Sequence, residues 1–137
     1  MADNHFAWPV RVYYEDTDAA GIVYHANYLR FMERARTEWL RALGYGQDRV
    51  RREHGVVFVI TESDVRYLAA ARFDEELVVT TRLERLRRAS MSFTQAIEAA
   101  DGRAVCSARN SVACVDAESL APRRIPADML KDFERAQ

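Results

Sequence analysis

The stretch YEDTDAAGIVYHANY, residues 14–28, sets the architecture of the chain because it joins an extended segment to a long amphipathic helix. It places two aspartates, a glycine and a histidine on the connecting loop. A tyrosine, a carboxylate and an imidazole this close together can supply a nucleophile or base, an acid and a hydrogen-bond donor. The start of the helix adds unpaired backbone N–H groups for a developing oxyanion. The alternative is a polar turn ahead of a core helix, since acids are common in loops.

Composition indicates one compact globular domain over residues 1–137, with 49% hydrophobic and 30% charged residues. The formal net charge is -1, and the basic residues are interspersed with acids, so no nucleic-acid partner is predicted. Residues 1–10 lack a basic segment followed by an apolar run, and no apolar run is long enough to cross a bilayer. These features predict a soluble, unexported, cytoplasmic protein without a transmembrane segment.

The two cysteines, Cys106 and Cys114, lie eight residues apart in what reads as one strand. At ~3.3 Å per residue they are roughly 26 Å apart, whereas a disulfide needs Cα atoms within about 7 Å. We expect two small buried hydrophobes in a reducing cytoplasm. Their spacing does not match a zinc site either.

Hydrophobic periodicity predicts a first strand from Val10 to Tyr14 and a helix from about Tyr24 to Leu43. Along one face of that helix, apolar residues recur at three- and four-residue steps, at Tyr28, Met32, Ala35, Trp39 and Leu43. The other face is charged and includes the i,i+4 pair Arg34 and Glu38. Gly44 and Gly46 supply the stop signal.

After Gly55 the period changes to that of a sheet. Residues 56–68 begin with a continuous apolar run, and residues 77–84 and 91–98 alternate apolar with polar positions, with Gln95 interrupting the apolar face. Asp101-Gly102 is a strong hairpin signal, so residues 104–115 should return antiparallel to the preceding strand. Pro122 and Pro126 end the sheet, and residues 127–135 can form a terminal helix. One early helix followed by extended segments predicts an α+β fold with an antiparallel sheet.

The stretch 14–28 resembles the signature of the hotdog-fold acyl-CoA thioesterases, in particular the 4-hydroxybenzoyl-CoA and Tol-Pal-associated (YbgC-type) group. The resemblance continues upstream through residues 8–13, downstream through residues 33–38, and weakly through residues 93–95 and 114–116. It implies a hotdog fold, in which a curved antiparallel sheet of about five strands wraps a long central helix. It also implies a homodimer or homotetramer, because Phe93 and Gln95 lie on long strands that one chain could cover only partly, and unpaired strand edges invite association.

The resemblance assigns the catalytic carboxylate to Asp18, as nucleophile on the thioester or general base for water. Both roles need an ionised carboxylate, which a nearby helix N-terminus favours; the alternative is a plain loop or capping aspartate. His25 would lie at the start of the helix and offer its backbone N–H to the thioester oxygen. Its imidazole either transfers a proton or is only structural. Tyr14 either hydrogen-bonds within the site or fills the core as a strand aromatic.

Further residues follow from the same resemblance. Gly21, Ile22 and Val23 are expected at the acyl group, with Gly21 needed for turn conformation or for close approach. Arg87 and Arg88 are candidate contacts for the CoA phosphates, although a solvated arginine-rich face is the alternative. Asp16 could join Asp18 and His25 in a metal site, but the group works without a metal or cofactor, and none is predicted.

Three acid or histidine positions are left without a catalytic role. His5 and His54 are expected at the surface. A second hotdog subgroup carries a carboxylate nucleophile on the helix after His-Gly-Gly, which this chain lacks, so Glu33 is predicted to be structural or interfacial. The sequence thus predicts an acyl-CoA thioesterase that releases CoA and a carboxylic acid. The alternative is a non-catalytic hotdog scaffold that binds acyl-CoA or acyl carrier protein at the cell envelope.

Overall fold

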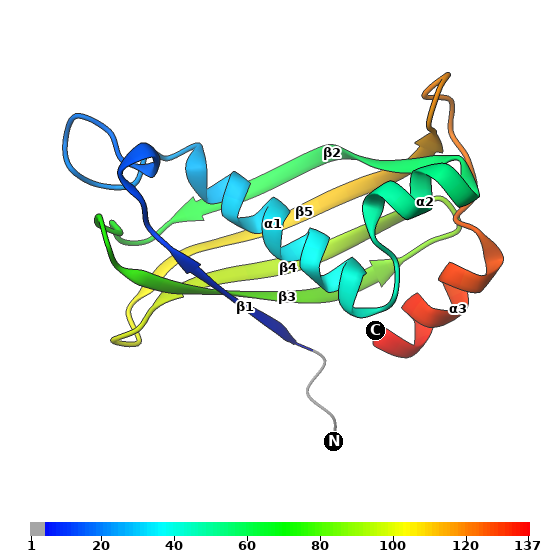
Figure 1. Cartoon of the computed structure of the whole chain (residues 1–137). Coiled ribbons are helices and arrows are strands. Elements are labelled where there is room, and N and C mark those ends of the chain that lie inside the picture. The colour runs from blue at the N-terminus through cyan, green and yellow to red at the C-terminus, as the bar shows by residue number, and fades with distance from the viewer. Residues whose placement is uncertain (1–4) are drawn as a thin grey trace.

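A five-stranded antiparallel sheet forms the body of the protein, in a computed structural model that describes residues 5–137. The strands lie in the order β1-β3-β4-β5-β2, so β1 and β2 are the edges (Figure 1). Their bounds are β1 Phe6–Arg11, β2 Val56–Tyr67, β3 Glu76–Leu86, β4 Ser90–Ala99 and β5 Ala104–Asp116. The expected α+β class with about five antiparallel strands is confirmed. The prediction that residues 1–10 lack a basic segment followed by an apolar run falls partly on residues 1–4, which lie outside the described part of the chain.

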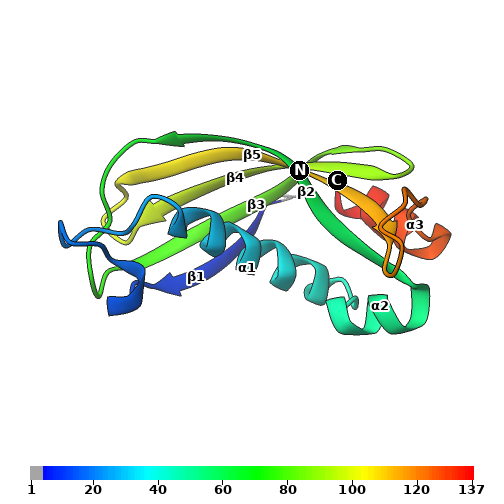
Figure 2. The same ribbon diagram turned by 90° about the horizontal axis from the view of Figure 1, so that it is seen from above.

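Three α-helices accompany the sheet: α1 Asn27–Ala42, α2 Gln47–His54 and α3 Ala127–Ala136. Seen from above, α1 runs along one face of the sheet, which curves over it (Figure 2). The loop before α1 lies at one end of the molecule, and α2 and α3 lie at the other (Figure 1). Within the described residues, no helix is both long and apolar enough to cross a membrane.

The first strand is shifted from its predicted position, since β1 covers Phe6–Arg11 rather than Val10–Tyr14. Pro9 is tolerated because β1 is an edge strand. Tyr14 instead opens a short 3-10 helix, η1, at Tyr14–Asp16. Helix α1 also starts later than Tyr24, because the N–H of Tyr24 donates to the carbonyl of Asp16 (2.8 Å) and holds that residue in the loop.

The predicted buried stripe of α1 is largely confirmed, with Tyr28, Met32, Ala35 and Trp39 buried, but Leu43 is only partly covered. The stripe is wider than predicted and includes Asn27, Phe31 and Leu40. The predicted pair between Arg34 and Glu38 does not form: Glu38 pairs with Arg41, and the guanidinium of Arg34 lies over the ring of Phe31 at 5.8 Å.

Helix α2 was not predicted. Val50 is its one buried residue, so the sequence has no helical periodicity there. The terminal helix was predicted, and Met129 and Phe133 of α3 bury against the core. The Tyr45 hydroxyl ties α3 to the α1–α2 connection through a 2.5 Å hydrogen bond to Asp132, which raises the pKa of Tyr45 to about 12.

The predicted hairpin at Asp101-Gly102 is confirmed, since the N–H of Gly102 donates to the carbonyl of Ala99 (3.0 Å) between β4 and β5. Cys106 and Cys114 are free and buried on β5, and burial raises the pKa of Cys106 to about 11. The thiols therefore behave as small hydrophobes.

The prediction that one chain covers Phe93 and Gln95 only partly is wrong. Phe93 is 2% exposed and Gln95 is fully buried within a single chain. The Gln95 amide nitrogen donates to the carbonyl of Met32 (3.0 Å) and to the Thr81 hydroxyl (2.9 Å). Both donors of this nitrogen are therefore satisfied, although Gln95 lies on the apolar face of the sheet.

Candidate active site

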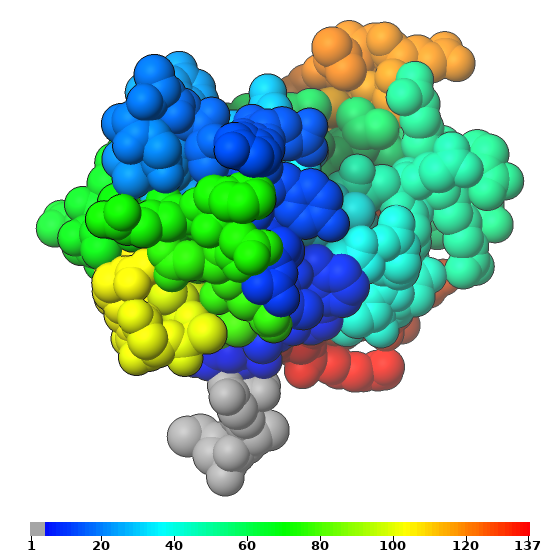
Figure 3. Space-filling view, turned by 60° about the vertical axis from the view of Figure 1, so that its left-hand side comes forward, coloured from blue at the N-terminus to red at the C-terminus, as the bar shows by residue number. Residues whose placement is uncertain are grey.

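The loop between β1 and α1 folds into a tight hairpin of its own. Thr17 and Val23 form an isolated antiparallel bridge, and the N–H of Asp18 donates to the carbonyl of Ile22 (2.9 Å). At the tip, the N–H of Gly21 donates back to the carbonyl of Asp18 (3.0 Å). The loop packs on the segment around residues 67–76, with the 100–103 turn beyond it (Figure 3).

Asp18 lies at the solvent-exposed tip of this hairpin. Its Oδ1 accepts a hydrogen bond from the N–H of Ala20 (2.8 Å), as in an Asx turn. Within residues 5–137 its Oδ2 has no hydrogen-bond donor. One carboxylate oxygen therefore orients the side chain, while the other is open to a substrate or water.

Gly21 was predicted either for the conformation of the turn or for close approach of the acyl group. Its φ is +80°, a region that other residues rarely adopt. A Cβ added here would find no heavy atom within 4 Å in this chain. The turn geometry explains the glycine, and nothing within the chain would obstruct a side chain.

Asp16 has the opposite surroundings to Asp18, because it is 3% exposed and both of its oxygens accept hydrogen bonds from the protein. Oδ2 accepts from the N–H of Tyr13 (2.8 Å), and Oδ1 accepts from Nδ2 of Asn27 (2.7 Å). Asp16 thus connects η1 to the first residue of α1 and fixes where the loop meets the helix. Among the described residues, no group of three potential ligands could hold a metal ion, so the geometry lends no support to a site built from Asp16, Asp18 and His25.

His25 lies just before α1 and is exposed. Its ring contacts those of Tyr24 (centroids 4.5 Å apart) and Tyr67 (6.2 Å, edge-on). Within the described part of the chain, its backbone N–H donates to no acceptor. The N–H therefore remains available near the positive end of the helix dipole, where an oxyanion is stabilised.

Tyr14 is neither a strand residue nor a core residue, so that alternative is wrong. It lies in η1, is 78% exposed, and packs its ring on Phe73 with centroids 4.5 Å apart. Sequence reasoning did not identify Phe73, which contacts Tyr14, or Tyr67, which contacts His25, because both lie far along the chain from the loop. The signal available in the sequence was an aromatic residue at two positions where a polar residue is expected. These are Tyr67 at the end of β2 and Phe73 just before β3.

Ile22 and Val23 occupy the second arm of the loop. Val23 is 3% exposed, and its N–H donates to the carbonyl of Ala71 (2.8 Å). Ile22 is partly buried and bridges to Arg72. The Val23 side chain belongs to the core, so Gly21 and Ile22 are the part of this segment that a ligand can reach.

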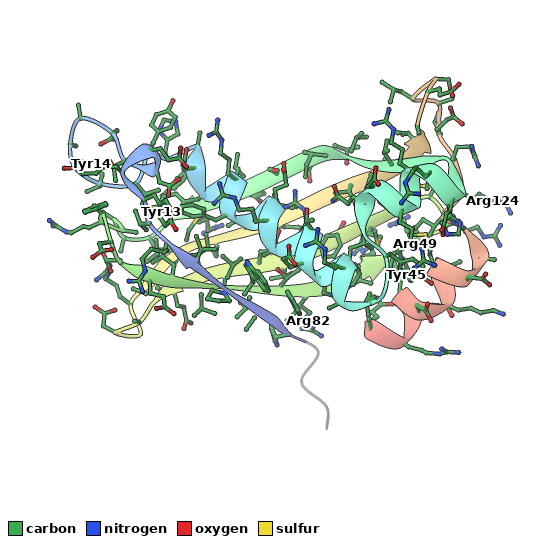
Figure 4. All side chains as sticks on the ribbon, viewed as in Figure 1. Tyr13, Tyr14, Tyr45, Arg49, Arg82 and Arg124 are labelled. Atoms are coloured by element: carbon green, nitrogen blue, oxygen red, sulfur yellow. The ribbon has the colours of Figure 1, made fainter. Side chains whose placement is uncertain are left out.

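Arg87 and Arg88 are not near Asp18 in this chain. They form the β3–β4 turn, and the carbonyl of Arg88 accepts from the N–H of Ile125 (2.8 Å). Because β3 spans Glu76–Leu86 at ~3.3 Å per residue, the turn is roughly 35 Å along the sheet from the loop end. In Figure 4, Tyr14 lies at one end of the molecule and Arg124, the neighbour of Ile125 in the chain, lies at the other.

Comparison with known proteins places this chain in a family. Residues 12–133 match the sequence model of the Thioesterase-like superfamily. The chain belongs to this family. It is 44% identical over 135 residues to the acyl-CoA thioester hydrolase YbgC of Escherichia coli O157:H7, covering 98% of this chain and 100% of that protein. The membership confirms the predicted resemblance and, at the level of the family, the predicted thioester hydrolase.

Other relatives agree with this membership. The acyl-CoA thioesterase YbgC of Haemophilus influenzae is 41% identical, covering 97% of both chains. In three dimensions, the chain is similar to the DHNA-CoA thioesterase of Staphylococcus aureus, with a TM-score of 0.91 at 21% identity, covering 97% of this chain and 91% of that one. The structural likeness supports the hotdog fold.

Proposed function

We propose that the protein hydrolyses acyl-CoA thioesters to CoA and a carboxylic acid, with Asp18 as the catalytic carboxylate. The observation that carries this proposal is a single loop in which, within residues 5–137, one carboxylate oxygen of Asp18 has no donor and the N–H of His25 has no acceptor. An ionised base and an oxyanion donor are the two groups that acyl transfer needs. The family membership identifies the bond that is broken.

Asp18 can promote hydrolysis of the thioester in either of two ways. As general base, the carboxylate takes a proton from water, whose oxygen attacks the thioester carbonyl and gives a tetrahedral oxyanion near the His25 N–H. Collapse breaks the C–S bond, and the thiolate takes a proton to become CoA. As nucleophile, Asp18 forms an anhydride and expels the thiolate, and water then hydrolyses the anhydride. No cofactor is needed in either route.

The CoA nucleotide is proposed to bind Arg87 and Arg88, together with Arg124, which the sequence did not single out. All three are exposed, and none has a carboxylate partner among the described residues. Arg87 and Arg88 are far from Asp18 within one chain. The proposal therefore requires that the β3–β4 turn of a second protomer lie beside the Asp18 loop of the first. A solvated arginine face remains the competing interpretation.

We propose that protomers associate through β2 into a homodimer, or a tetramer built from dimers. This strand is an edge of the sheet and exposes apolar side chains, with Val59 37%, Ile60 47% and Tyr67 51% exposed. An unpaired edge with apolar residues favours addition of another strand. We also propose a cytoplasmic location, consistent with two free buried thiols, and an association with the Tol-Pal envelope system by likeness to the group.

Association is tested by light scattering on the purified chain, which should give a dimer or tetramer of the 15.7 kDa protomer. Ile60→Asp should shift the protein toward monomer and reduce turnover, because a charge would be buried at the β2 edge. Leu120→Asp is the matched control, since Leu120 is 61% exposed and lies after β5. A stable, fully active wild-type monomer would rule out the shared site.

The activity itself is tested by thiol release from a panel of acyl-CoAs that varies in chain length and aromatic character. We expect turnover of at least one class above the rate without enzyme. Tight binding of acyl-CoA without any thiol release would instead favour the scaffold that binds acyl-CoA or acyl carrier protein. The panel also identifies the acyl group.

A further inference from the structure

The second arm of the Asp18 loop takes its position from another part of the chain. The N–H of Val23 donates to the carbonyl of Ala71 (2.8 Å), and Ile22 forms an isolated antiparallel bridge with Arg72. The same arm holds Asp18, whose N–H donates to the carbonyl of Ile22 (2.9 Å). Ala71 and Arg72 lie between β2 and β3 and belong to neither strand. The hydrogen-bond ladder of the sheet therefore does not fix the backbone on which the loop rests.

Three side chains hold the backbone of residues 70–72. The Tyr28 hydroxyl, on α1, accepts from the N–H of Ala71 (3.2 Å). Oε1 of Glu75 accepts from the N–H of the residue after Ala71 (2.9 Å), and Nη2 of Arg103 donates to the carbonyl of the residue before it (3.3 Å). Each of three successive residues thus has one backbone group bound by a side chain.

Arg103 and Glu75 also bind each other. Nη2 of Arg103 donates to both carboxylate oxygens of Glu75, at 2.9 and 2.7 Å, and these hydrogen bonds raise the pKa of Arg103. The two side chains are 37% and 25% exposed, so the pair is partly covered. Nη1 of Arg103 donates to Asp101 in the β4–β5 turn (3.0 Å). In Figure 3 this turn, in yellow, lies against the green segment below the blue loop. Charge-assisted hydrogen bonds are roughly twice as strong as neutral ones, so Arg103 ties the turn firmly to residues 70–72.

We propose that Arg103 is a positioning residue for thioester hydrolysis, because together with Glu75 it fixes residues 70–72 and thereby the Asp18 loop. Neither side chain needs to touch the substrate for this role. Displacement of a reacting group by about 1 Å can lower turnover about 100-fold, so the loss of this brace should be visible in the rate. The proposal rests on the proposed function, since it concerns the same carboxylate.

A second arginine–glutamate pair separates positioning from simple stabilisation of the fold. Nε and Nη2 of Arg109, on β5, donate to the two carboxylate oxygens of Glu84, on β3 (3.1 Å each). The Thr94 hydroxyl donates to Glu84 as well (2.7 Å). This pair joins residues far apart in the chain, as Arg103 and Glu75 do, but it links strands of the sheet to each other. Arg109→Met is therefore the matched control for Arg103→Met.

The kinetic test compares these two variants, each of which removes one guanidinium and keeps an unbranched side chain. We expect Arg103→Met to lower kcat about tenfold with KM within about threefold of wild type, because the chemical step depends on the position of Asp18. Arg109→Met should leave both constants unchanged. In the Asp18→Asn background, Arg103→Met should cause no further loss, since a residue that acts only through Asp18 then has no carboxylate to position.

Amide hydrogen exchange tests the same link without a substrate. In Arg103→Met, the N–H groups of Val23 and Asp18 should exchange about tenfold faster, because exchange reports local opening of the hydrogen bonds that hold the loop. The N–H of Ile125, which donates to a carbonyl in the β3–β4 turn, should exchange at the wild-type rate. An effect confined to the loop distinguishes the loss of a brace from a loss of global stability.

Glu75→Gln keeps the test valid if Arg103→Met fails to fold, because it removes the charge and keeps an acceptor for the backbone. It should change kcat and exchange in the same direction as Arg103→Met. The proposal is overturned by unchanged exchange at Val23 and Asp18, or by kcat within about twofold of wild type. A loss of kcat that is equal in Arg109→Met, or that persists in Asp18→Asn, overturns it as well. If the wild-type protein hydrolyses no acyl-CoA, the proposed function fails, whereas the exchange measurement still decides whether Arg103 holds the loop.

Discussion

Asp18→Asn is expected to lower turnover by about 100-fold or more, while folding and acyl-CoA binding stay intact. The substitution keeps the shape of the side chain and removes the negative charge that both roles of Asp18 require. The amide oxygen can still accept from the N–H of Ala20, and the residue is exposed, so the loop should keep its conformation. Thiol-release kinetics give the loss of turnover, and direct binding of a non-hydrolysable acyl-CoA analogue gives the affinity.

Asp16→Asn is the matched control, with the same chemical change two residues away. Both oxygens of Asp16 accept hydrogen bonds, and an amide can replace only one of them. This variant should lose about 1–3 kcal/mol of stability, seen as a lower melting temperature, whereas Asp18→Asn should not. Turnover of Asp18→Asn within a few-fold of wild type would remove Asp18 from its proposed role.

The contrast between these aspartates shows what the sequence could and could not predict about the site. The motif identified the loop, but Asp16 and Asp18 are the same residue type two positions apart. The resemblance ranked Asp18 above Asp16, but the difference between their surroundings follows from the Thr17–Val23 bridge, which closes the hairpin and leaves Asp16 buried against Asn27 and Asp18 exposed at the tip. The aromatic contacts of Tyr14 and His25 come from Phe73 and Tyr67, which no local pattern links to the loop.

The fold was predictable where one face of an element is buried and the pattern is long. Strands β3, β4 and β5 alternate clearly, and the Asp101-Gly102 turn fixes their hairpin. Helix α2 has a single buried residue and so has no period to detect. The signal in the sequence for the end of α2 was Gly55, which caps the helix with a φ of +68°. The position of β1 depended on pairing with β3, which tolerates Pro9 only because β1 is an edge.

His25→Ala is expected to reduce turnover by close to ~100-fold, because we assign proton transfer to the imidazole in addition to oxyanion binding by the backbone. The substitution leaves the backbone N–H in place, so the oxyanion contribution should survive. The side chain is exposed and makes ring contacts only with Tyr24 and Tyr67, so the fold should be unaffected. His54→Ala is the matched control, since His54 ends α2 at the far side of the molecule.

The pH dependence separates the side chain of His25 from its backbone. If the imidazole transfers a proton, wild-type kcat/KM measured across pH 5 to 9 should show a limb that His25→Ala lacks. His54→Ala should keep that limb. If only the N–H matters, His25→Ala retains near wild-type activity and an unchanged profile, and His25→Pro, which removes the N–H, loses activity instead. That outcome would leave Asp18 as the sole side-chain catalyst and His25 as a position that serves through its backbone.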